Sequence, residues 1–265
     1  MRIRELTGFL ESIAPLNYQE NYDNAGLICG NWDTEIQGVL IALDSTEAIV
    51  EEAIAKKCNL IVAHHPIVFR GLKRFNGSNY VERTVIKAIK NDIAIYAIHT
   101  NLDNVFIKGV NEKIAEKIGL TGTSILAPKP GVVNPEQTIG AGIVGTLRNP
   151  MEETYFLEFL KKTMQTGCVR YTALLNKPVS RIAVCGGSGS FLLAAAIEEK
   201  ADVFITGDFK YHEFFDAENK IIIADIGHFE SEQFTIELLY ELISGKFSNF
   251  ALHCTEVVTN PVKYL

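Results

Sequence analysis

The sequence lacks the features that mark membrane, secreted and nucleic-acid-binding proteins. Its 265 residues contain no uninterrupted apolar run of the about 18 to 20 residues that cross a bilayer. The start, Met1-Arg2-Ile3-Arg4-Glu5-Leu6, has an early acid and no long apolar segment, unlike a signal peptide. Lys and Arg form no rich run, and 25 basic against 32 acidic residues give a net charge of −7. We expect neither a membrane nor a nucleic-acid partner.

Cysteine is also scarce, and its spacing excludes two common kinds of site. The five cysteines are odd in number and form no Cys-x-x-Cys pair, so neither a zinc ribbon nor a dithiol redox site is indicated. They are Cys29, Cys58, Cys168, Cys185 and Cys254. Reduced, mostly buried thiols in a cytoplasmic protein are the expected state.

What the sequence does contain is a series of apolar runs that alternate with helical patterns. At roughly 150 residues per domain, the length suits one large or two medium domains. The expected strands are 39–43, 60–63, 93–98, 182–185, 203–206, 221–224 and 250–253, and the expected helices are 3–14, 46–57, 81–90, 110–118, 191–200 and 230–243. This alternation predicts an α/β fold of two similarly wound modules with mainly parallel sheets, and a metal site between the modules at strand carboxyl ends.

The module boundary is expected in Thr121–Pro135, which is rich in Gly, Pro and Thr. Two strand–helix–strand units have the same spacing, since both Val39 to Leu60 and Ile182 to Val203 are 21 residues apart. Because the last helix could pack on the first module, we expect a first domain of 1–124 plus about 230–265 and a second of 125–229.

Histidines are few, but they gather in one kind of place. Of six histidines, five lie at or just beyond the expected carboxyl end of a strand, where open α/β sheets display functional groups. His64-His65 follows one strand, and the stretch His99-Thr100-Asn101-Leu102-Asp103 follows another. Asp225 and then Gly227-His228-Phe229-Glu230-Ser231-Glu232 follow a third. These strand ends are the candidate site.

The spacing of these residues suits a pair of metal ions. His228 and Glu232 are four residues apart at the start of a helix and can converge on one ion. The side chains of adjacent His64 and His65 diverge, so two ions about 3.5 to 4 Å apart would serve them better, with Glu232 or Asp103 bridging. Imidazoles with carboxylates suit zinc, iron, manganese, nickel or cobalt rather than calcium.

Structural roles remain open for several of these residues. His253 has no acidic cluster beside it and is interpreted as structural, whereas His212 could be catalytic, an orienting group or a surface residue. Gly186-Gly187-Ser188-Gly189-Ser190 could cradle an anion or only allow a tight turn. Asp44 and Ser45 are helix-cap candidates, and Asp23, Asn24 and Asp44 could also orient metal ligands.

Several motifs together resemble a known family. They are Tyr22-Asp23-Asn24-Ala25-Gly26-Leu27, Ala42-Leu43-Asp44, His64-His65-Pro66, His99-Thr100-Asn101-Leu102-Asp103, Thr206-Gly207-Asp208 and Gly227-His228-Phe229-Glu230-Ser231-Glu232, in this order across nearly the whole chain. In order and spacing they resemble the Nif-three-like dinuclear-metal family, whose members are commonly named GTP cyclohydrolase 1 type 2 homologues. The resemblance implies as metal ligands His64, His65, Asp103, His228 and Glu232.

The resemblance also implies two α/β domains and a toroidal homohexamer with metal sites facing an internal cavity. Longer members insert a further domain in mid-chain, and 265 residues leave no room for it. Any property that depends on the insert is not expected here, and the motifs do not establish a GTP-opening activity.

Two functions are consistent with the sequence. The first is a metal-dependent hydrolase with two divalent ions per chain, acting on a small, phosphorylated or nucleotide-like substrate through an activated water. His99, Asp208 and His212 are its candidate proton-transfer or orienting groups, and polar strand-end residues beyond the five ligands, such as Asn101 and Asp225, favour this reading. The second is a metal-binding or partner-binding ring without turnover.

Overall fold

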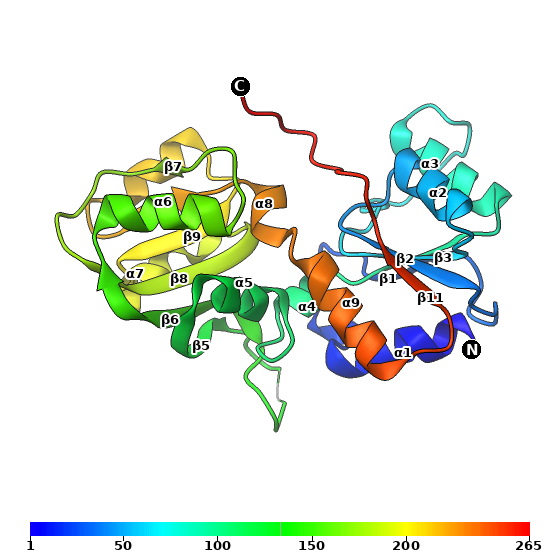
Figure 1. Ribbon diagram of the computed structural model, residues 1–265, viewed down its shortest axis with the longest axis horizontal. Helices are drawn as coiled ribbons and strands as arrows, with labels where there is room; N and C mark the ends of the chain where they lie inside the picture. The colour runs from blue at the N-terminus through cyan, green and yellow to red at the C-terminus, as the bar shows by residue number, and fades with distance from the viewer. Residues whose placement is uncertain (133) are drawn as a thin grey trace. The chain divides into compact units, whose positions relative to one another are not determined.

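The computed structural model describes residues 1–132 and 134–265 and contains two compact units (Figure 1). The first unit comprises Met1–Leu102 and Thr235–Pro261, and the second comprises Asp103–Phe234 and Val262–Leu265. Each unit is an α/β layer structure built on one sheet, which confirms the expected fold class.

The first unit has a five-stranded sheet in the order β1-β4-β3-β2-β11. The strands are β1 (Gly26–Cys29), β2 (Gly38–Ala42), β3 (Leu60–Ala63), β4 (Ala94–Ala97) and β11 (Ala251–Cys254). Four of them run parallel, and β1 pairs with β4 in the antiparallel direction. The parallel order places the carboxyl ends of β3 and β4 side by side, so residues that follow these two strands meet at one edge.

Helices cover both faces of this sheet (Figure 1). The helices α2 (Glu47–Ala55) and α3 (Tyr80–Lys90) lie on one face, while α1 (Ile3–Ile13) and α9 (Thr235–Lys246) lie on the other. The three central strands, β2, β3 and β4, are buried along their whole length and are continuous apolar runs, as strands covered on both faces are. Thr46 caps α2 by accepting the N–H of Ile49, so neither Asp44 nor Ser45 is the cap.

The second unit has a six-stranded sheet in the order β5-β6-β8-β9-β10-β7. The strands are β5 (Leu120–Pro128), β6 (Gly140–Met151), β7 (Arg170–Tyr171), β8 (Val179–Ser188), β9 (Val203–Gly207) and β10 (Ile222–Asp225). The expected strands β8, β9 and β10 run parallel, whereas β5, β6 and β7, which the apolar pattern does not predict, pair in the antiparallel direction.

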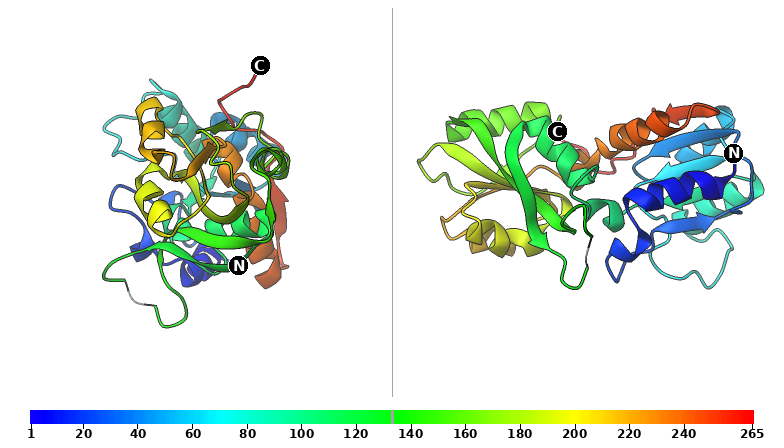
Figure 2. Two further views of the ribbon diagram at one scale, coloured as in Figure 1. Left: turned by 90° about the vertical axis from the view of Figure 1, so that its left-hand side faces the viewer. Right: turned by 90° about the horizontal axis from the view of Figure 1, so that it is seen from below.

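Helices also enclose the second sheet, as Figure 2 shows. One face packs against α7 (Leu193–Glu198), around a cluster that includes Phe204 and Ile223, and α6 (Glu153–Thr163) covers the other. The remaining helices of the chain are α4 (Thr100–Asp103), α5 (Val110–Ile118), α8 (His228–Glu232) and the short 3-10 helices η1 (Leu16–Tyr18), η2 (Ser190–Leu192) and η3 (Tyr211–Ala217). None of the helices in the described residues is long and apolar enough to cross a membrane.

The repeated spacing seen in the sequence is a repeated register in the structure. Val39 of β2 lies opposite Leu60 of β3, and Ile182 of β8 lies opposite Val203 of β9. Each unit therefore contains a strand–helix–strand segment in which paired residues of the two parallel strands are 21 positions apart. In both units this segment brings polar residues to the carboxyl edge of a sheet.

The border between the units differs from the expected one. Residues 103–124 belong to the second unit because β5 pairs with β6 along most of its length. Much of Thr121–Pro135, expected as the crossing, therefore lies in a strand, and Val133 within it lies outside the described residues. The last helix and strand join the first unit, as α9 and β11.

Candidate metal centre

The first unit brings three histidines together at the carboxyl edge of its sheet. His64 and His65 directly follow β3, and His99 lies two residues beyond β4. The ring centres of His64 and His65 are 4.9 Å apart, and those of His99 lie 5.2 and 5.3 Å from them. One nitrogen from each ring lies within 4.8 Å of the others. The two adjacent rings therefore diverge less than neighbouring side chains on a strand usually do.

Each of these rings is held through its Nδ1 atom by an oxygen. His64 Nδ1 lies 2.8 Å from the carbonyl oxygen of Ile98, His65 Nδ1 lies 2.8 Å from Asp44, and His99 Nδ1 lies 2.7 Å from Asp23. Because these oxygens accept hydrogen bonds, the proton belongs on Nδ1 and the lone pair on Nε2. This is the arrangement in which proteins present an imidazole to a metal ion.

Asp23 is a fully buried carboxylate that fixes His99 and its surroundings. Besides the His99 ring it accepts the backbone N–H of Thr100 at 3.0 Å and the Thr100 hydroxyl. Burial opposes its ionisation, but the hydrogen bond from His99 and those from Thr100 lower the pKa of Asp23 to about 2. Buried Asn101 accepts the N–H of His99 and donates to the Ala14 carbonyl, so its amide serves the backbone.

Asp44 performs the same task for His65. Its second carboxylate oxygen accepts the hydroxyl proton of Thr259, from the extended segment after β11. Burial raises the pKa of Asp44, but the hydrogen bonds from His65 and Thr259 outweigh it and hold that pKa below the usual range. Asp44 is predicted from its sequence motif as a potential orienting residue, but Thr259 is not, because the two are 215 positions apart in the chain.

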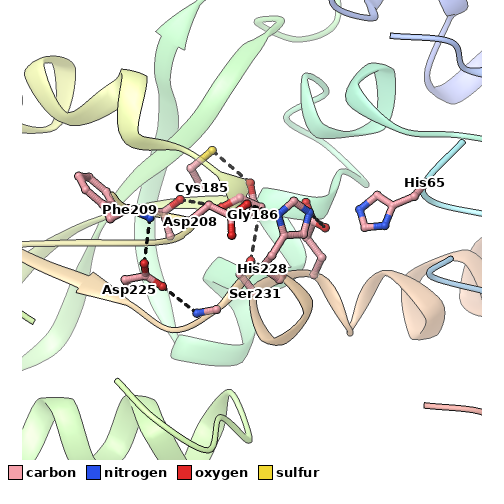
Figure 3. Close-up of polar contacts among 12 residues, drawn as sticks. His65, Cys185, Gly186, Asp208, Phe209, Asp225, His228 and Ser231 are labelled. Atoms are coloured by element: carbon pink, nitrogen blue, oxygen red, sulfur yellow. Dashed lines mark hydrogen bonds and ion pairs between the residues drawn. The ribbon is translucent and has the colours of Figure 1, made fainter. Parts of the chain in front are cut away.

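The second unit brings His228 and Glu232 together on α8, as the four-residue spacing predicts. His228 Nε2 lies 3.1 Å from a Glu232 carboxylate oxygen, and Glu232 is buried. His228 Nδ1 lies 2.7 Å from Asp208, which follows β9 (Figure 3). Burial alone would lower the pKa of His228, but the hydrogen bonds to Asp208 and Glu232 raise it to about 11. The two carboxylates thus stabilise the protonated form of the His228 ring.

Asp103 and Glu232 both act on the thiol of buried Cys185. Burial raises the pKa of Cys185, and repulsion from the carboxylates of Asp103 and Glu232 raises it further. The carboxylates of Asp103 and Glu232 therefore lie near the same thiol. Cys185 itself is held as a neutral thiol and is unsuited to be a nucleophile.

The glycine-rich stretch after Cys185 makes room for Glu232. A Cβ atom on Gly187 would lie 2.4 Å from Glu232 Oε1, and Gly187 also has a left-handed φ of +64°. The Gly187 N–H donates to the hydroxyl of Ser231, which donates to the carbonyl of His228. Close approach to α8 therefore explains this glycine, which the sequence analysis assigned to an anion cradle or a tight turn.

The other histidines lie apart from these groups. His212 is exposed on η3, where its ring contacts those of Tyr211 and Phe215. His253 lies in β11, opposite Leu40 of β2. The five ligands that the resemblance implies divide between the units, with His64 and His65 in the first and Asp103, His228 and Glu232 in the second.

Fold, motifs and donor groups together define a class of protein, and the comparison with known families agrees. The profile of the family described as Duf34/NIF3 (NGG1p interacting factor 3) matches residues 1–261, so the chain belongs to this family. Similar proteins of Clostridium acetobutylicum and Campylobacter jejuni are both named GTP cyclohydrolase 1 type 2 homolog. The first is 30% identical over 98% of this chain and 96% of its own length, and the second is 32% identical over the full length of both.

Solved structures show the same fold. A hypothetical protein of Staphylococcus aureus superposes with a TM-score of 0.92 at 32% identity, covering 100% of this chain and 99% of that one. A Bacillus cereus protein related to NIF3 gives a TM-score of 0.90 at 26% identity with the same coverage. The similarity thus extends over both units.

Replacing Gly187 tests the close approach to Glu232. We expect Gly187→Ala to destabilise the protein by about 1 to 3 kcal/mol, because the methyl group meets the carboxylate and the left-handed backbone is strained. Urea unfolding measures this effect. Gly8→Ala is the control, since a Cβ there meets nothing within 4 Å and the residue lies in a helix. Equal unfolding midpoints for Gly187→Ala and the unchanged protein would contradict the explanation.

Acid titration tests the buried Asp23. Because the folded-state pKa of about 2 lies below the ordinary aspartate value of 3.8, the stabilisation from Asp23 is present above pH 3.8 and is lost as pH falls toward 2. The contribution is about 2 kcal/mol. We expect Asp23→Asn to be less stable at neutral pH and to lose less stability over this range in urea titrations. Asp33→Asn, at an exposed position, should retain the wild-type decline. Parallel pH profiles for Asp23→Asn and wild type would refute the assignment.

Proposed function

We propose that the protein binds two divalent transition-metal ions per chain through His64, His65, Asp103, His228 and Glu232 and uses them to hydrolyse a small substrate. The observation that carries the proposal is a hydrogen bond common to the three histidines. In His64, His65 and His228 the Nδ1 atom lies 2.7 to 2.8 Å from an oxygen. A surface histidine needs no such partner. Three imidazoles with two carboxylates suit zinc, iron, manganese, nickel or cobalt.

The burial of the donors also fits a metal centre. His64 is buried and Glu232 is 3% exposed. Burying a carboxylate is costly unless a cation compensates it, and in the described residues His228 provides one contact of this kind. Divalent ions held here would polarise the bond under attack and activate water near neutral pH.

The chain's own residues would orient the ligands and move protons. Asp44 and Asp208 fix the rings of His65 and His228, so Asp208 acts here by positioning. His99, held by Asp23, is the first candidate for receiving a proton at Nε2, because its ring lies against those of His64 and His65. Exposed His212 is a second candidate.

The substrate class rests on the relatives. Because the Clostridium and Campylobacter proteins are named GTP cyclohydrolase 1 type 2 homolog, we propose a nucleotide-like or phosphorylated small molecule for this chain. We also propose the homohexamer that the family resemblance implies. The five cysteines are free thiols, which supports a reducing compartment such as the cytoplasm.

A non-catalytic metal-binding or partner-binding ring is the second candidate function. It is favoured by the hydrogen bonds of two polar residues, Asn101 and Asp225, that the sequence suggested were available for catalysis. Asn101 and Asp225 are both buried and engaged in hydrogen bonds to backbone groups. Fewer polar residues beyond the five proposed ligands are therefore available for catalysis than the sequence suggests.

Metal content tests the binding proposal. After supplementation with zinc, manganese, iron, nickel or cobalt, elemental analysis should find about two ions per chain, as expected for a two-metal site. The double variant His64→Ala/His65→Ala should lose most of this metal, and His253→Ala, at a strand position outside the donor groups, should keep it. Far fewer than two ions in the wild type, or unchanged content in the double variant, would reject the proposed site.

Turnover separates the two functions. Metal-loaded protein is offered nucleotides including GTP, phosphoesters and cyclic amides, and products are followed by chromatography. We expect hydrolysis of at least one class, with Glu232→Gln slower by about 100-fold or more because a charged ligand is lost. Loaded wild type that is no faster than this variant on every class would favour the scaffold.

A further inference from the structure

Asp225 lies where two neighbouring strands end together. It is the last residue of β10, and its register partner in β9 is Thr206. Beyond this pair, the segments that follow β9 and β10 enter separate turns. Asp208 lies in the first turn, and the second leads to His228. The Asp225 side chain is 2% exposed and therefore lies between the backbone segments that present this hydrogen-bonded pair.

The two oxygens of Asp225 hold the two turns. One oxygen accepts the N–H of Phe209 at 2.9 Å, and the other accepts the N–H of Gly227 at 3.0 Å. Figure 3 shows the contact between Asp225 and the backbone of Phe209, which follows Asp208 in the chain. A single rigid carboxylate thus sets the spacing of both segments.

Both segments have a positive φ angle, and the one at Asp208 is strained. Asp208 has a left-handed φ of +61°, which is costly for a residue other than glycine, and Gly227 has a φ of +94°. The turns also touch, since a Cβ atom on Gly207 would lie 2.8 Å from the backbone nitrogen of His228. Strained conformations of this kind persist only where surrounding bonds define them.

Arg170 completes the arrangement from β7. Its Nη2 atom pairs with Asp225 and donates to the carbonyl oxygen of Phe209 at 3.1 Å. The guanidinium lies over the ring of Phe214, 5.3 Å from its centre. The buried carboxylate therefore has a cation as partner, which removes the main cost of its burial.

We propose that Asp225, with Arg170, is a positioning residue that fixes the Asp208–His228 hydrogen bond and thereby the direction of His228 Nε2. The consequence for metal affinity rests on the proposed function, whereas the effect on the His228 ring does not. In the part of the chain that the structure describes, the hydrogen bonds and the ion pair of Asp225 go to Phe209, Gly227 and Arg170 and not to the His228 ring. It acts through the two backbone turns.

The same sheet offers a matched control. Asp202, which is 9% exposed, accepts the backbone N–H groups of Ser180 and Arg181 at 2.9 and 2.8 Å and pairs with Lys177. It precedes β9, at the opposite end of that strand from Asp208. Asp225→Asn and Asp202→Asn therefore remove comparable bonds, but only the first should change His228.

The first measurement uses the metal-free, full-length protein. Long-range proton–nitrogen NMR correlations of the imidazole rings report which nitrogen of His228 carries a hydrogen bond. We expect the Nδ1 resonance of His228 to move in Asp225→Asn and to stay at the wild-type position in Asp202→Asn. Arg170→Lys keeps the charge but not the planar fork, so it should move the same resonance in the same direction. It also provides the test if Asp225→Asn does not fold.

The second measurement is zinc affinity by competition with a chelator. We expect the dissociation constant to rise by about 10- to 100-fold in Asp225→Asn, as for other residues that orient ligands, and to stay unchanged in Asp202→Asn. If Asp225→Asn or Arg170→Lys leaves the His228 resonance at its wild-type position, the inference is wrong. If the resonance moves as expected but wild type binds no zinc, the metal function fails and the positioning role stands.

Discussion

The arrangement of the candidate centre depends on one interaction, the hydrogen bond from a histidine Nδ1 to an oxygen. It occurs at four rings, with a main-chain carbonyl at His64 and carboxylates at His65, His99 and His228. Each bond fixes the ring plane, and in a neutral imidazole it also fixes the tautomer, because a neutral ring whose Nδ1 donates has its lone pair at Nε2. A ring without that acceptor could rotate and would present either nitrogen.

Sheet topology supplies these acceptors. In each unit two adjacent parallel strands, β3 with β4 and β9 with β10, end at the same level, so the residues after them become neighbours. Parallel strands require helical crossovers, which cover both faces and leave only the strand ends for polar groups. In the first unit this arrangement brings together His64, His65 and His99. In the second unit it brings Asp208 to the start of α8, where His228 lies.

Much of this could be predicted from local patterns. Val39 and Leu60, and likewise Ile182 and Val203, are equally spaced in the sequence and are register partners in the sheets. The four-residue spacing of His228 and Glu232 correctly predicted that their side chains meet. Strand β5 was missed because Gly and Thr interrupt its apolar pattern. The contact of Asp44 with Thr259 could not be predicted, because a hydroxyl 215 positions away leaves no local trace in the sequence. Close approaches, such as that of Gly187 to Glu232, arise only after the elements have packed.

The discontinuity of the first unit constrains how the chain can fold during synthesis. Its sheet is completed by β11, and one face is covered by α9 together with α1. Both β11 and α9 come from residues 235–254, after the second unit in the chain. The second unit, apart from its final four residues, is made earlier and can assemble while the first still exposes the edge of β2. An unpaired parallel edge is prone to association with other chains. Ribosome-bound chains that end before residue 251 should therefore depend more on chaperones than the released protein does.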